Sequence, residues 1–247
     1  MTEHASKVLV VEDEDGIRDR IVRILGFEGF EARGASSVRE GLRLSQEFSP
    51  DVIVSDIMMP QSDGLDLIGL LRSRQETRLT PVIMLTALSE REWQRRFMEM
   101  GADDYITKPF SAEELVGAVK TQCRKLEWRN AEVQSQGTQN FGFEFAGRLF
   151  DPIRRTVTRE GFDVEILTIS ESQLLMILLE DAGDLLSREV LLERMGRQFS
   201  PLDRTIDVLV GRLRRKIGDD PRAAQILVTV RSSGYVLNSE VRRVAIN

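Results

Sequence analysis

The chain has 247 residues, of which 30% are charged, and a formal net charge of −6. Its single cysteine, Cys123, excludes an internal disulfide framework, and with one histidine, His4 in a polar leader, zinc sites and catalytic triads built on histidine lack their usual base. Because no apolar run approaches the ~20 residues of a membrane span and no signal-peptide pattern is present, we expect a cytoplasmic protein of one or two domains.

Short apolar runs alternate with segments of helical periodicity through the first half of the chain. The runs cover residues 8–11, 52–54, 82–85 and 105–106, with a weaker one at 30–33. They are rich in aliphatic and β-branched residues, as in parallel strands that are buried on both faces. Helices are expected to begin near Gly16, Ser37, Gly64, Ser89 and Ser111. This order predicts an α/β unit with a five-stranded, doubly wound parallel sheet.

Three of these helices begin with the spacing of a capping box, in which a hydroxyl and a carboxylate three residues apart satisfy the first backbone N–H groups. The three pairs are Ser37 with Glu40, Ser89 with Glu92, and Ser111 with Glu114.

Polar residues follow each of the strands, and these carry the predicted chemistry: Glu12, Asp13, Asp56, Thr86 and Lys108. Since the carboxyl ends of parallel strands meet at one edge, these residues should share one crevice. Three carboxylates close together repel one another, and Mg²⁺ relieves that repulsion. An oxygen of Asp56 could then attack phosphorus while Lys108 and Thr86 stabilise the transferring oxygens. The pattern predicts an aspartate that accepts a phosphoryl group.

The motifs "VLVVEDE", "DVIVSDIMMPQSDG", "VIMLTA" and "GADDYITKPF" occur in this order. They resemble the receiver domain of two-component response regulators, which is flavodoxin-like, over roughly residues 5 to 127. The resemblance implies that Asp56 is the phosphoacceptor. It also implies that Asp13 and Asp56 bind Mg²⁺ together with the backbone carbonyl of Met58, and that Glu12 holds the ion through water.

The same resemblance gives roles to residues around the acceptor. Lys108, which precedes a proline that is usually cis in such domains, would grip the phosphoryl group, and Thr86 with Tyr105 matches the family's switch pair. Met58 and Leu88 stand at positions that flank the path of the hydrolytic water. Because both are apolar, we expect slow self-dephosphorylation.

The sequence changes character after Lys125. Residues 132–140 lack apolar periodicity and are interpreted as a flexible linker. We therefore expect a receiver at 1–127, a linker at 128–140 and a second domain at 141–247.

The second domain begins with an alternating, strand-like pattern over 141–169, with turns at 151–152 and 160–161. A helix with capping-box spacing follows at Ser170 to Gln173, and a second helix is expected at 188–195 after Ser187. A third is expected at 204–217, and the chain finishes with a hairpin of 226–230 and 235–237.

The third helix has one apolar stripe, which we expect to face the core: Ile206, Val210, Leu213 and Ile217. Val208, Arg212 and Arg215 lie on a different face. An arginine-rich exposed face fits the DNA major groove, although a solvated basic face is the alternative interpretation of the helix alone.

The motifs "LTISESQLLMILLEDAGDLLSREVLLERM", "DRTIDVLVGRLRRKIGDDP" and "ILVTVRSSGYVL" resemble the α+β winged-helix effector domain of the OmpR/PhoB family, over roughly residues 141 to 240. The resemblance implies a DNA-binding set of Arg204, Thr205, Val208, Arg212, Arg214, Thr229 and Arg231. Within it, Arg214 and Thr229 would contact phosphate and Arg231 the minor groove. Gly211 and Ser232 depart from the family pattern, in which the first position is often basic and the second is usually glycine.

Family members dimerise on phosphorylation through a face of the receiver. The residues that match this face are Glu99, Asp104, Glu114 and Lys120. Gln94 and Ala118 stand where basic residues are common, and Trp93 replaces an acidic one. We therefore expect an altered dimer face that includes Trp93.

Together these patterns predict a phosphorylation-controlled, DNA-binding transcriptional regulator and not an enzyme. Its expected partners are a sensor histidine kinase, double-stranded DNA, RNA polymerase and a second copy of the chain. One alternative is a regulator of the same fold that works without phosphorylation. Another is an aspartate-nucleophile phosphatase, but such an enzyme usually has a second aspartate where Met58 stands.

Overall fold

A computed structural model describes residues 5–59, 62–87, 99–135, 140–196 and 205–246. The chain divides into two compact units, Met1–Leu126 and Glu127–Asn247. No helix among the described residues is both long enough and apolar enough to cross a membrane.

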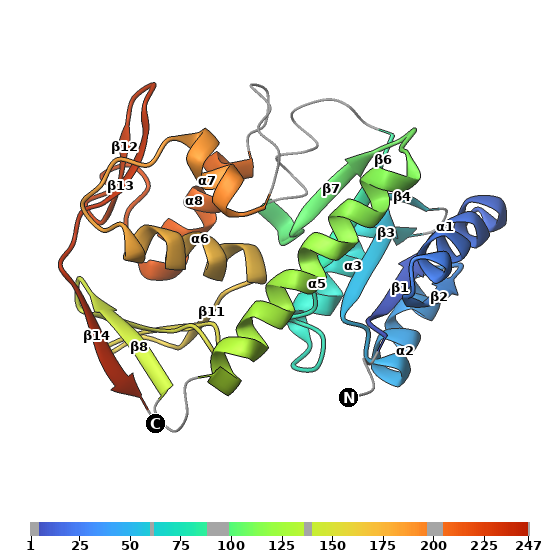
Figure 1. Ribbon diagram of the computed structural model, residues 1–247, viewed down its shortest axis with the longest axis horizontal. Helices are drawn as coiled ribbons and strands as arrows, with labels where there is room; N and C mark the ends of the chain where they lie inside the picture. The colour runs from blue at the N-terminus through green and yellow to red at the C-terminus, as the bar shows by residue number, and fades with distance from the viewer. Residues whose placement is uncertain (1–4, 60–61, 88–98, 136–139, 197–204, 247) are drawn as a thin grey trace. The chain divides into compact units, whose positions relative to one another are not determined.

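The first unit is built on a five-stranded parallel sheet (Figure 1). Its strands are β1 (Lys7–Val11), β2 (Glu31–Ala35), β3 (Val52–Asp56), β6 (Val82–Thr86) and β7 (Asp104–Thr107). They lie in the order β2-β1-β3-β6-β7, so all five predicted strands are confirmed. A short antiparallel pair, β4 (Met58–Met59) and β5 (Ser62–Asp63), follows β3.

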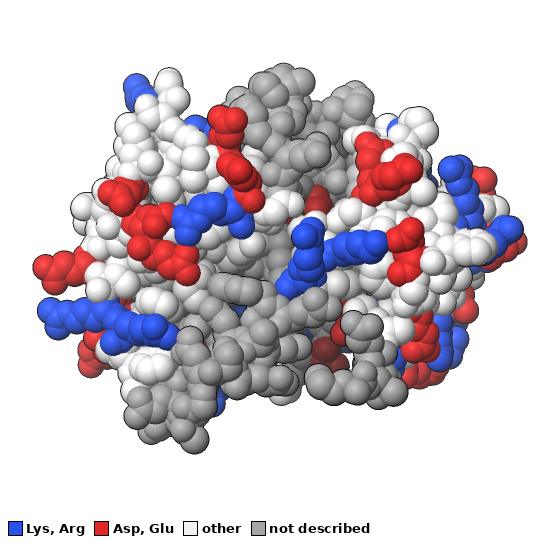
Figure 2. Space-filling model, in the orientation of Figure 1, with Lys and Arg blue, Asp and Glu red and all other residues white. Residues whose placement is uncertain are grey.

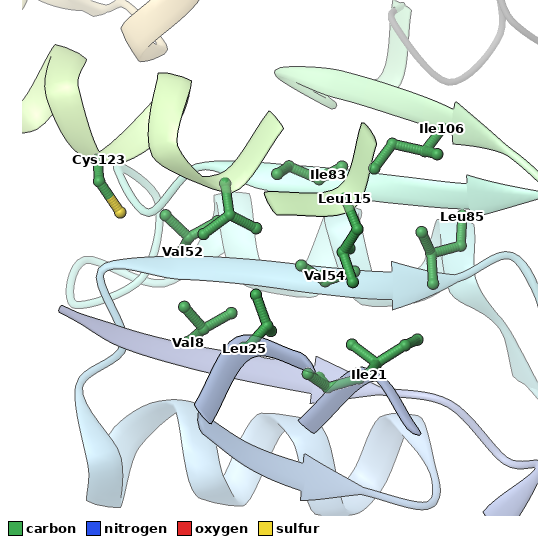
Figure 3. Packing of buried hydrophobic residues seen from close by; sticks show 12 residues of the cluster. Val8, Ile21, Leu25, Val52, Val54, Ile83, Leu85, Ile106, Leu115 and Cys123 are labelled. Atoms are coloured by element: carbon green, nitrogen blue, oxygen red, sulfur yellow. The ribbon is translucent and has the colours of Figure 1, made fainter. Parts of the chain in front are cut away.

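Helices cover both faces of this sheet. They are α1 (Asp15–Phe27), α2 (Val38–Phe48), α3 (Gly64–Ser73) and α5 (Ala112–Ser135). On one face, Ile21 and Leu25 of α1 and Leu115 of α5 pack against alternate strand residues such as Val54 (Figure 3). On the other face α2 approaches β1 so closely that a Cβ on Gly41 would lie 2.9 Å from a methyl of Val11.

The caps of these helices match the predictions only in part. Ser111 and Glu114 form the predicted reciprocal box at the start of α5. Ser37 accepts from the Glu40 backbone, but the Glu40 carboxylate binds the N–H and hydroxyl of Ser36 instead of Ser37. The Ser89 to Glu92 pair lies outside the described residues.

The expected linker is wrong over most of its length, because α5 continues to Ser135. Residues 128–135 include Glu, Ala, Arg and Gln, which favour helix, and contain neither glycine nor proline. Because the end of this helix is polar, it lacks the apolar periodicity that marks a packed helix, and the sequence pattern alone favours a linker.

The second unit contains a five-stranded antiparallel sheet in the order β11-β10-β9-β8-β14. These strands are β8 (Asn140–Phe145), β9 (Arg148–Asp151), β10 (Thr156–Arg159), β11 (Glu165–Ile166) and β14 (Val241–Ile246). Strand β14 was not predicted. It pairs along the whole of β8, from Val241 opposite Phe145 to Ile246 opposite Asn140.

Three helices and a hairpin complete this unit. They are α6 (Ile169–Glu180), α7 (Arg188–Arg194), α8 (Thr205–Ile217), β12 (Leu227–Val230) and β13 (Gly234–Leu237). Ser187 caps α7 as predicted. The box predicted at Ser170 to Gln173 is wrong, because α6 is capped by Thr168 and Glu171 and Ser170 lies within the helix. Both pairs fit the same spacing pattern, so the pattern alone could not choose between them.

The β12–β13 hairpin is held against the segment before α7. The backbones of Leu186 and Tyr235 exchange two hydrogen bonds of 2.9 Å. Gly234 has φ 153° at this contact, and a Cβ there would overlap the carbonyl oxygen of Leu186, so only glycine fits. Ser232, in the turn, has φ 62°, a conformation that glycine adopts more readily.

Candidate phosphoacceptor site and DNA-binding surface

Three carboxylates meet where the strand order of the first unit reverses, between β1 and β3. Glu12 and Asp13 follow β1, and Asp56 ends β3. Each offers an oxygen, and these oxygens all lie within 4.8 Å of one another. Glu12 and Asp56 are buried and Asp13 is half-buried. These three side chains therefore lie together at the carboxyl edge of the sheet.

Lys108 joins two of the carboxylates. Its Nζ lies 2.8 Å from Oε2 of Glu12 and 3.0 Å from Oδ2 of Asp56. Burial raises the pKa of Glu12, the ammonium of Lys108 opposes this, and the charge of Asp56 adds to the rise. Burial alone would lower the pKa of Lys108, but its contacts with Glu12 and Asp56 outweigh that effect and raise it. Three acids beside one ammonium leave the site rich in negative charge.

The two oxygens of Asp56 have different partners. Oδ1 accepts from the backbone N–H of Ile57 at 2.8 Å, whereas Oδ2 faces Lys108. Met58, two residues after Asp56, is 64% exposed. The carboxylates of Glu12, Asp13 and Asp56 offer oxygen ligands and negative charge, which suit a hard cation such as Mg²⁺.

The two residues expected to form a switch pair, Thr86 and Tyr105, lie on strands β6 and β7. Thr86 ends β6 and is buried, and its carbonyl accepts from the backbone N–H of Lys108 at 2.7 Å. Tyr105 is half-buried on β7, opposite Met84. The peptide bond between Lys108 and Pro109 is cis, as the motif predicted. Leu88 lies outside the described residues.

The apolar stripe predicted on α8 is confirmed, because Ile206, Val210, Leu213 and Ile217 are all buried. Three of the residues expected to face DNA are buried in the structure. Thr205, Val208 and Arg212 are 2%, 8% and 5% exposed. Leu209 beside them is fully buried. Arg204 lies outside the described residues.

Arg212 is buried because it pairs with a carboxylate on another helix. Its Nε lies 2.7 Å from Oε1 of Glu171 on α6, and Nζ of Lys216 lies 2.6 Å from Oε2. Burial alone would raise the pKa of Glu171, but the charges of Arg212 and Lys216 and hydrogen bonds from Lys216 and Thr168 lower it. Sequence reasoning missed this triad because Glu171 is far from α8 in the chain. The sequence does contain one sign of the role of Glu171: it stands three residues after Thr168, at the spacing of a capping box.

Other arginines supply the accessible positive charge near α8. Arg215 is exposed, and Arg231 is exposed in the hairpin turn. Arg214 donates to the carbonyl of Leu227 at 2.9 and 2.5 Å and to Oγ1 of the exposed Thr229 at 2.7 Å. On the face shown in Figure 2, acidic and basic side chains are interspersed among the described residues.

A second cluster, missed by sequence reasoning, joins α7, α8 and the hairpin. Nε of Arg188 lies 2.8 Å from Oδ1 of Asp207, and the hydroxyl of Tyr235 donates to the same oxygen. Burial and the carboxylate of Asp207 raise the pKa of Tyr235 to about 12. The start of α8 is thereby fixed to the base of the hairpin.

The residues matched to a dimer face have partners within the chain. Glu114 caps α5, and Nζ of Lys120 lies 2.6 Å from Oε2 of Glu28 on the surface. Asp104 is buried, and its Oδ1 accepts from the N–H of Tyr105. Glu99 is exposed. Trp93 and Gln94 lie outside the described residues.

Comparison with known proteins decides the family. The family described as "Response regulator receiver domain" matches residues 8–120, and the family described as "Transcriptional regulatory protein, C terminal" matches residues 164–237. The transcriptional regulatory protein AruR of Pseudomonas aeruginosa is 34% identical over 239 residues, covering 94% of this chain and 96% of its own. The chain is a two-component response regulator of the OmpR/PhoB type.

Two further similarities agree with this assignment. The transcriptional regulatory protein GltR of Pseudomonas aeruginosa is 32% identical over 243 residues, covering 98% of each chain. A solved structure of a mutant of RitR has a TM-score of 0.74 at 20% identity, covering 96% of this chain and all of its own, which supports the fold. The response regulator is therefore a phosphorylation-controlled transcription regulator, and the phosphorylation-independent and phosphatase alternatives are not favoured. Its first unit is the receiver and its second the winged-helix effector.

Proposed function

We propose that the receiver accepts a phosphoryl group on Asp56 from a sensor histidine kinase and thereby controls binding of the effector to an operator. The observation that carries this proposal is the cluster of Glu12, Asp13 and Asp56 with Lys108 at the carboxyl edge of the sheet.

Glu12, Asp13 and Asp56 would hold Mg²⁺, with the backbone carbonyl of Met58 as a further ligand. Bound there, the ion would neutralise charge on the transferring oxygens. Burial is the main cause of the raised pKa of Glu12 and the charge of Asp56 adds to it, so a cation bound between the two carboxylates would relieve part of their repulsion.

In the transfer, an oxygen of Asp56 forms a bond to phosphorus as the bond between phosphorus and the histidine nitrogen of the kinase breaks, and the released imidazole keeps the electron pair. Oδ2 is the candidate nucleophile, because Oδ1 accepts the Ile57 N–H. Lys108 would exchange its contact with Oδ2 for a phosphoryl oxygen, and the Thr86 hydroxyl would follow, with Tyr105 moving inward behind it.

On the effector, we propose that DNA is contacted by Arg204, Arg214, Arg215, Thr229 and Arg231. Arg212, Thr205 and Val208 are not proposed as contacts, because they are buried. Arg214 and Thr229 would contact phosphate together since they are already bonded to each other, and Arg231 would enter the minor groove.

We also propose that phosphorylation promotes a homodimer and that the DNA-bound dimer acts on RNA polymerase. Glu114, Lys120 and Asp104 would have to leave or share their present partners to pair across a dimer, so an interface that relies on Trp93 is favoured. Sedimentation of the full chain with a phosphoryl mimic should show weaker dimerisation in Trp93→Ala than in the wild type. Equal association would remove Trp93 from the interface.

The acceptor is tested by treating the full chain with an acyl phosphate and Mg²⁺ and measuring the intact mass. The wild type should gain one phosphoryl group, Asp56→Ala none, and the exposed Asp19→Asn on α1 should match the wild type. A phosphorylated Asp56→Ala chain would refute the assignment. Because Met58 and Leu88 are apolar, the phosphoryl group should then be lost slowly, and a lifetime of only seconds would contradict that expectation.

The link to transcription is tested by genome-wide binding of the wild type beside Asp56→Ala. Sites that are occupied by the wild type and lost in the variant would identify the operator and its dependence on phosphate. Equal occupancy would favour a regulator that works without phosphorylation.

A further inference from the structure

Arg18 of α1 lies beside the acidic site, and the transfer chemistry does not use it. Its Nη1 donates to the backbone carbonyl of Glu12 at 2.9 Å and, less closely, to that of Asp13 at 3.4 Å. Its Nη2 donates to the carboxylate of Asp15. The side chain is 16% exposed. One guanidinium thus spans from the first turns of α1 to the loop that carries two of the three acids.

The neighbouring strand leaves room for this side chain. Gly34 on β2 pairs with Val10 of β1, just before the acidic loop. A Cβ on Gly34 would lie 2.9 Å from Cδ and 3.0 Å from Cγ of Arg18, closer than van der Waals contact allows. The stem of Arg18 therefore lies directly against the backbone of β2, and any side chain at Gly34 would displace it.

We propose that Arg18 is a positioning residue that fixes the backbone of Glu12 and Asp13, so that their carboxylates converge with Asp56. The proposal rests on the function proposed above. Nη1 reaches both carbonyls while Nη2 of the same planar group is held by Asp15, so the guanidinium ties the acidic loop to the first turn of α1. Groups that orient metal-binding side chains in this way commonly change metal affinity by about 10–100-fold when they are removed.

Geometry can be separated from charge at this residue. The guanidinium is paired with Asp15, which is 84% exposed, so the Arg18 and Asp15 pair has no net charge. Replacing Arg18 alone would leave an extra negative charge near the site, which attracts a dication and would hide a loss of positioning. Replacing both members, as in Asp15→Asn with Arg18→Met, removes the guanidinium and leaves the net charge unchanged.

Gly34→Ala provides a second test that changes no charge. It should push the Arg18 stem away from β2 while all three acids and Lys108 remain. Gly26→Ala is the matched control, because a Cβ on Gly26 of α1 would meet no atom within 4 Å.

The experiment is calorimetric titration of the full chain with Mg²⁺, with thermal unfolding in the absence of the ion to confirm that each variant is folded. The double variant should bind Mg²⁺ on the order of tenfold more weakly than the wild type. Gly34→Ala should show a smaller loss in the same direction, and Gly26→Ala should bind as the wild type does.

A folded double variant that binds Mg²⁺ within about twofold of the wild type would overturn the positioning role. If the double variant does not fold, an unchanged affinity in Gly34→Ala overturns it instead. A wild-type chain that binds no Mg²⁺ and accepts no phosphoryl group would refute the proposed function itself, which distinguishes the two failures.

Discussion

The receiver and the effector each contain a cluster of opposite charges, but the two clusters differ in balance and in access. In the receiver, the carboxylates of Glu12, Asp13 and Asp56 gather beside the single ammonium of Lys108 at the edge of the sheet. In the effector, the single carboxylate of Glu171 is shared by Arg212 and Lys216 and is fully buried.

This difference separates a site that can change from one that holds helices together. In the proposed function, the excess negative charge of the receiver cluster would favour uptake of a cation, and Lys108 would move to a phosphoryl oxygen. The Glu171 carboxylate is enclosed by two cations and also accepts from the Thr168 backbone at 2.7 Å, so any rearrangement would leave buried charge unpaired. Similar chemical groups thus serve signalling in one unit and rigidity in the other.

The largest expected effect comes from breaking the effector cluster. Glu171→Gln keeps the shape of the side chain but removes the negative charge that pairs with the buried Arg212, which should lower the free energy of unfolding of the effector by about 3–5 kcal/mol. Hydrogen exchange of effector peptides as a function of denaturant measures this loss. Glu180→Gln on the same helix is the control, because its partner Arg194 is on the surface and the loss should stay below about 1 kcal/mol.

Glu171 should also make the stability of the effector depend on pH in the acidic range. Because the pKa of Glu171 is lower in the folded chain than its ordinary value of 4.5, its contribution to stability is complete above that value. It is lost as the pH falls through the lower, folded-state pKa. The stability of Glu171→Gln should fall less steeply over this window, and an identical slope in both proteins would show that Glu171 is not the group responsible.

Removing the ammonium of Lys108 should strengthen the binding of Mg²⁺ to the receiver. Lys108→Met takes away the ammonium that competes with Mg²⁺ for Glu12 and Asp56, and a charge this close is worth about 1 kcal/mol or more, so affinity should rise at least about fivefold. Calorimetric titration measures it. Lys120→Met, whose partner is Glu28 on the surface, should bind Mg²⁺ as the wild type does. Weaker binding in Lys108→Met would show that the ammonium supports the acids more than it competes for them.

An intermediate effect is expected where α8 meets the hairpin. Arg214→Met loses the bonds to Leu227 and Thr229 as well as the proposed phosphate contact, and should weaken binding to all DNA sequences by about 1–2 kcal/mol. The slope of affinity against salt concentration should fall by about 1. Binding titrations at several salt concentrations test this, with the exposed Arg222→Met as control. A change in sequence preference with the salt slope unchanged would contradict the assignment.

The smallest expected effect is in the hairpin turn. Ser232 has a left-handed backbone at φ 62°, so Ser232→Gly should stabilise the hairpin by up to about 1 kcal/mol. Exchange protection of the Ser233 amide, which donates to the carbonyl of Val230, reports on this turn. Ser233→Gly should not stabilise it, because the backbone of Ser233 is not left-handed. Equal gains in both variants would point to flexibility and not to relieved strain.

The place of the receiver site can be predicted from the sequence because the sheet topology fixes it. Once five buried strands are assigned, the residues after them must meet at one edge, whatever the details of packing, and Glu12, Asp56 and Lys108 do so. The face of α8 had no such constraint. Helical periodicity places Arg212 and Arg215 on the same face of α8. In the structure Arg212 is buried against Glu171, whereas Arg215 is exposed.

The remaining errors have related causes. The cap of α6 was predicted two residues too late because two pairs have the same spacing, Thr168 with Glu171 and Ser170 with Gln173. Burial of Glu171 in the folded effector distinguishes the two pairs. Strand β14 was missed because its exposed arginines, Arg242 and Arg243, interrupt the apolar alternation that marks a strand.

Strand β14 also has a consequence for the order in which the protein is made. Within the described part of the chain, the outer side of the effector's first strand, β8, pairs with residues 241–246, and the hydrogen bond from Ala146 to Ser239 beside them joins positions 93 residues apart. During translation, β8 must therefore remain open on that side until nearly all of the effector has left the ribosome, whereas receiver strands pair with nearer neighbours. A ribosome that stalls before residue 241 would present an unpaired strand edge, a template for aggregation, beside a receiver whose own residues are already complete.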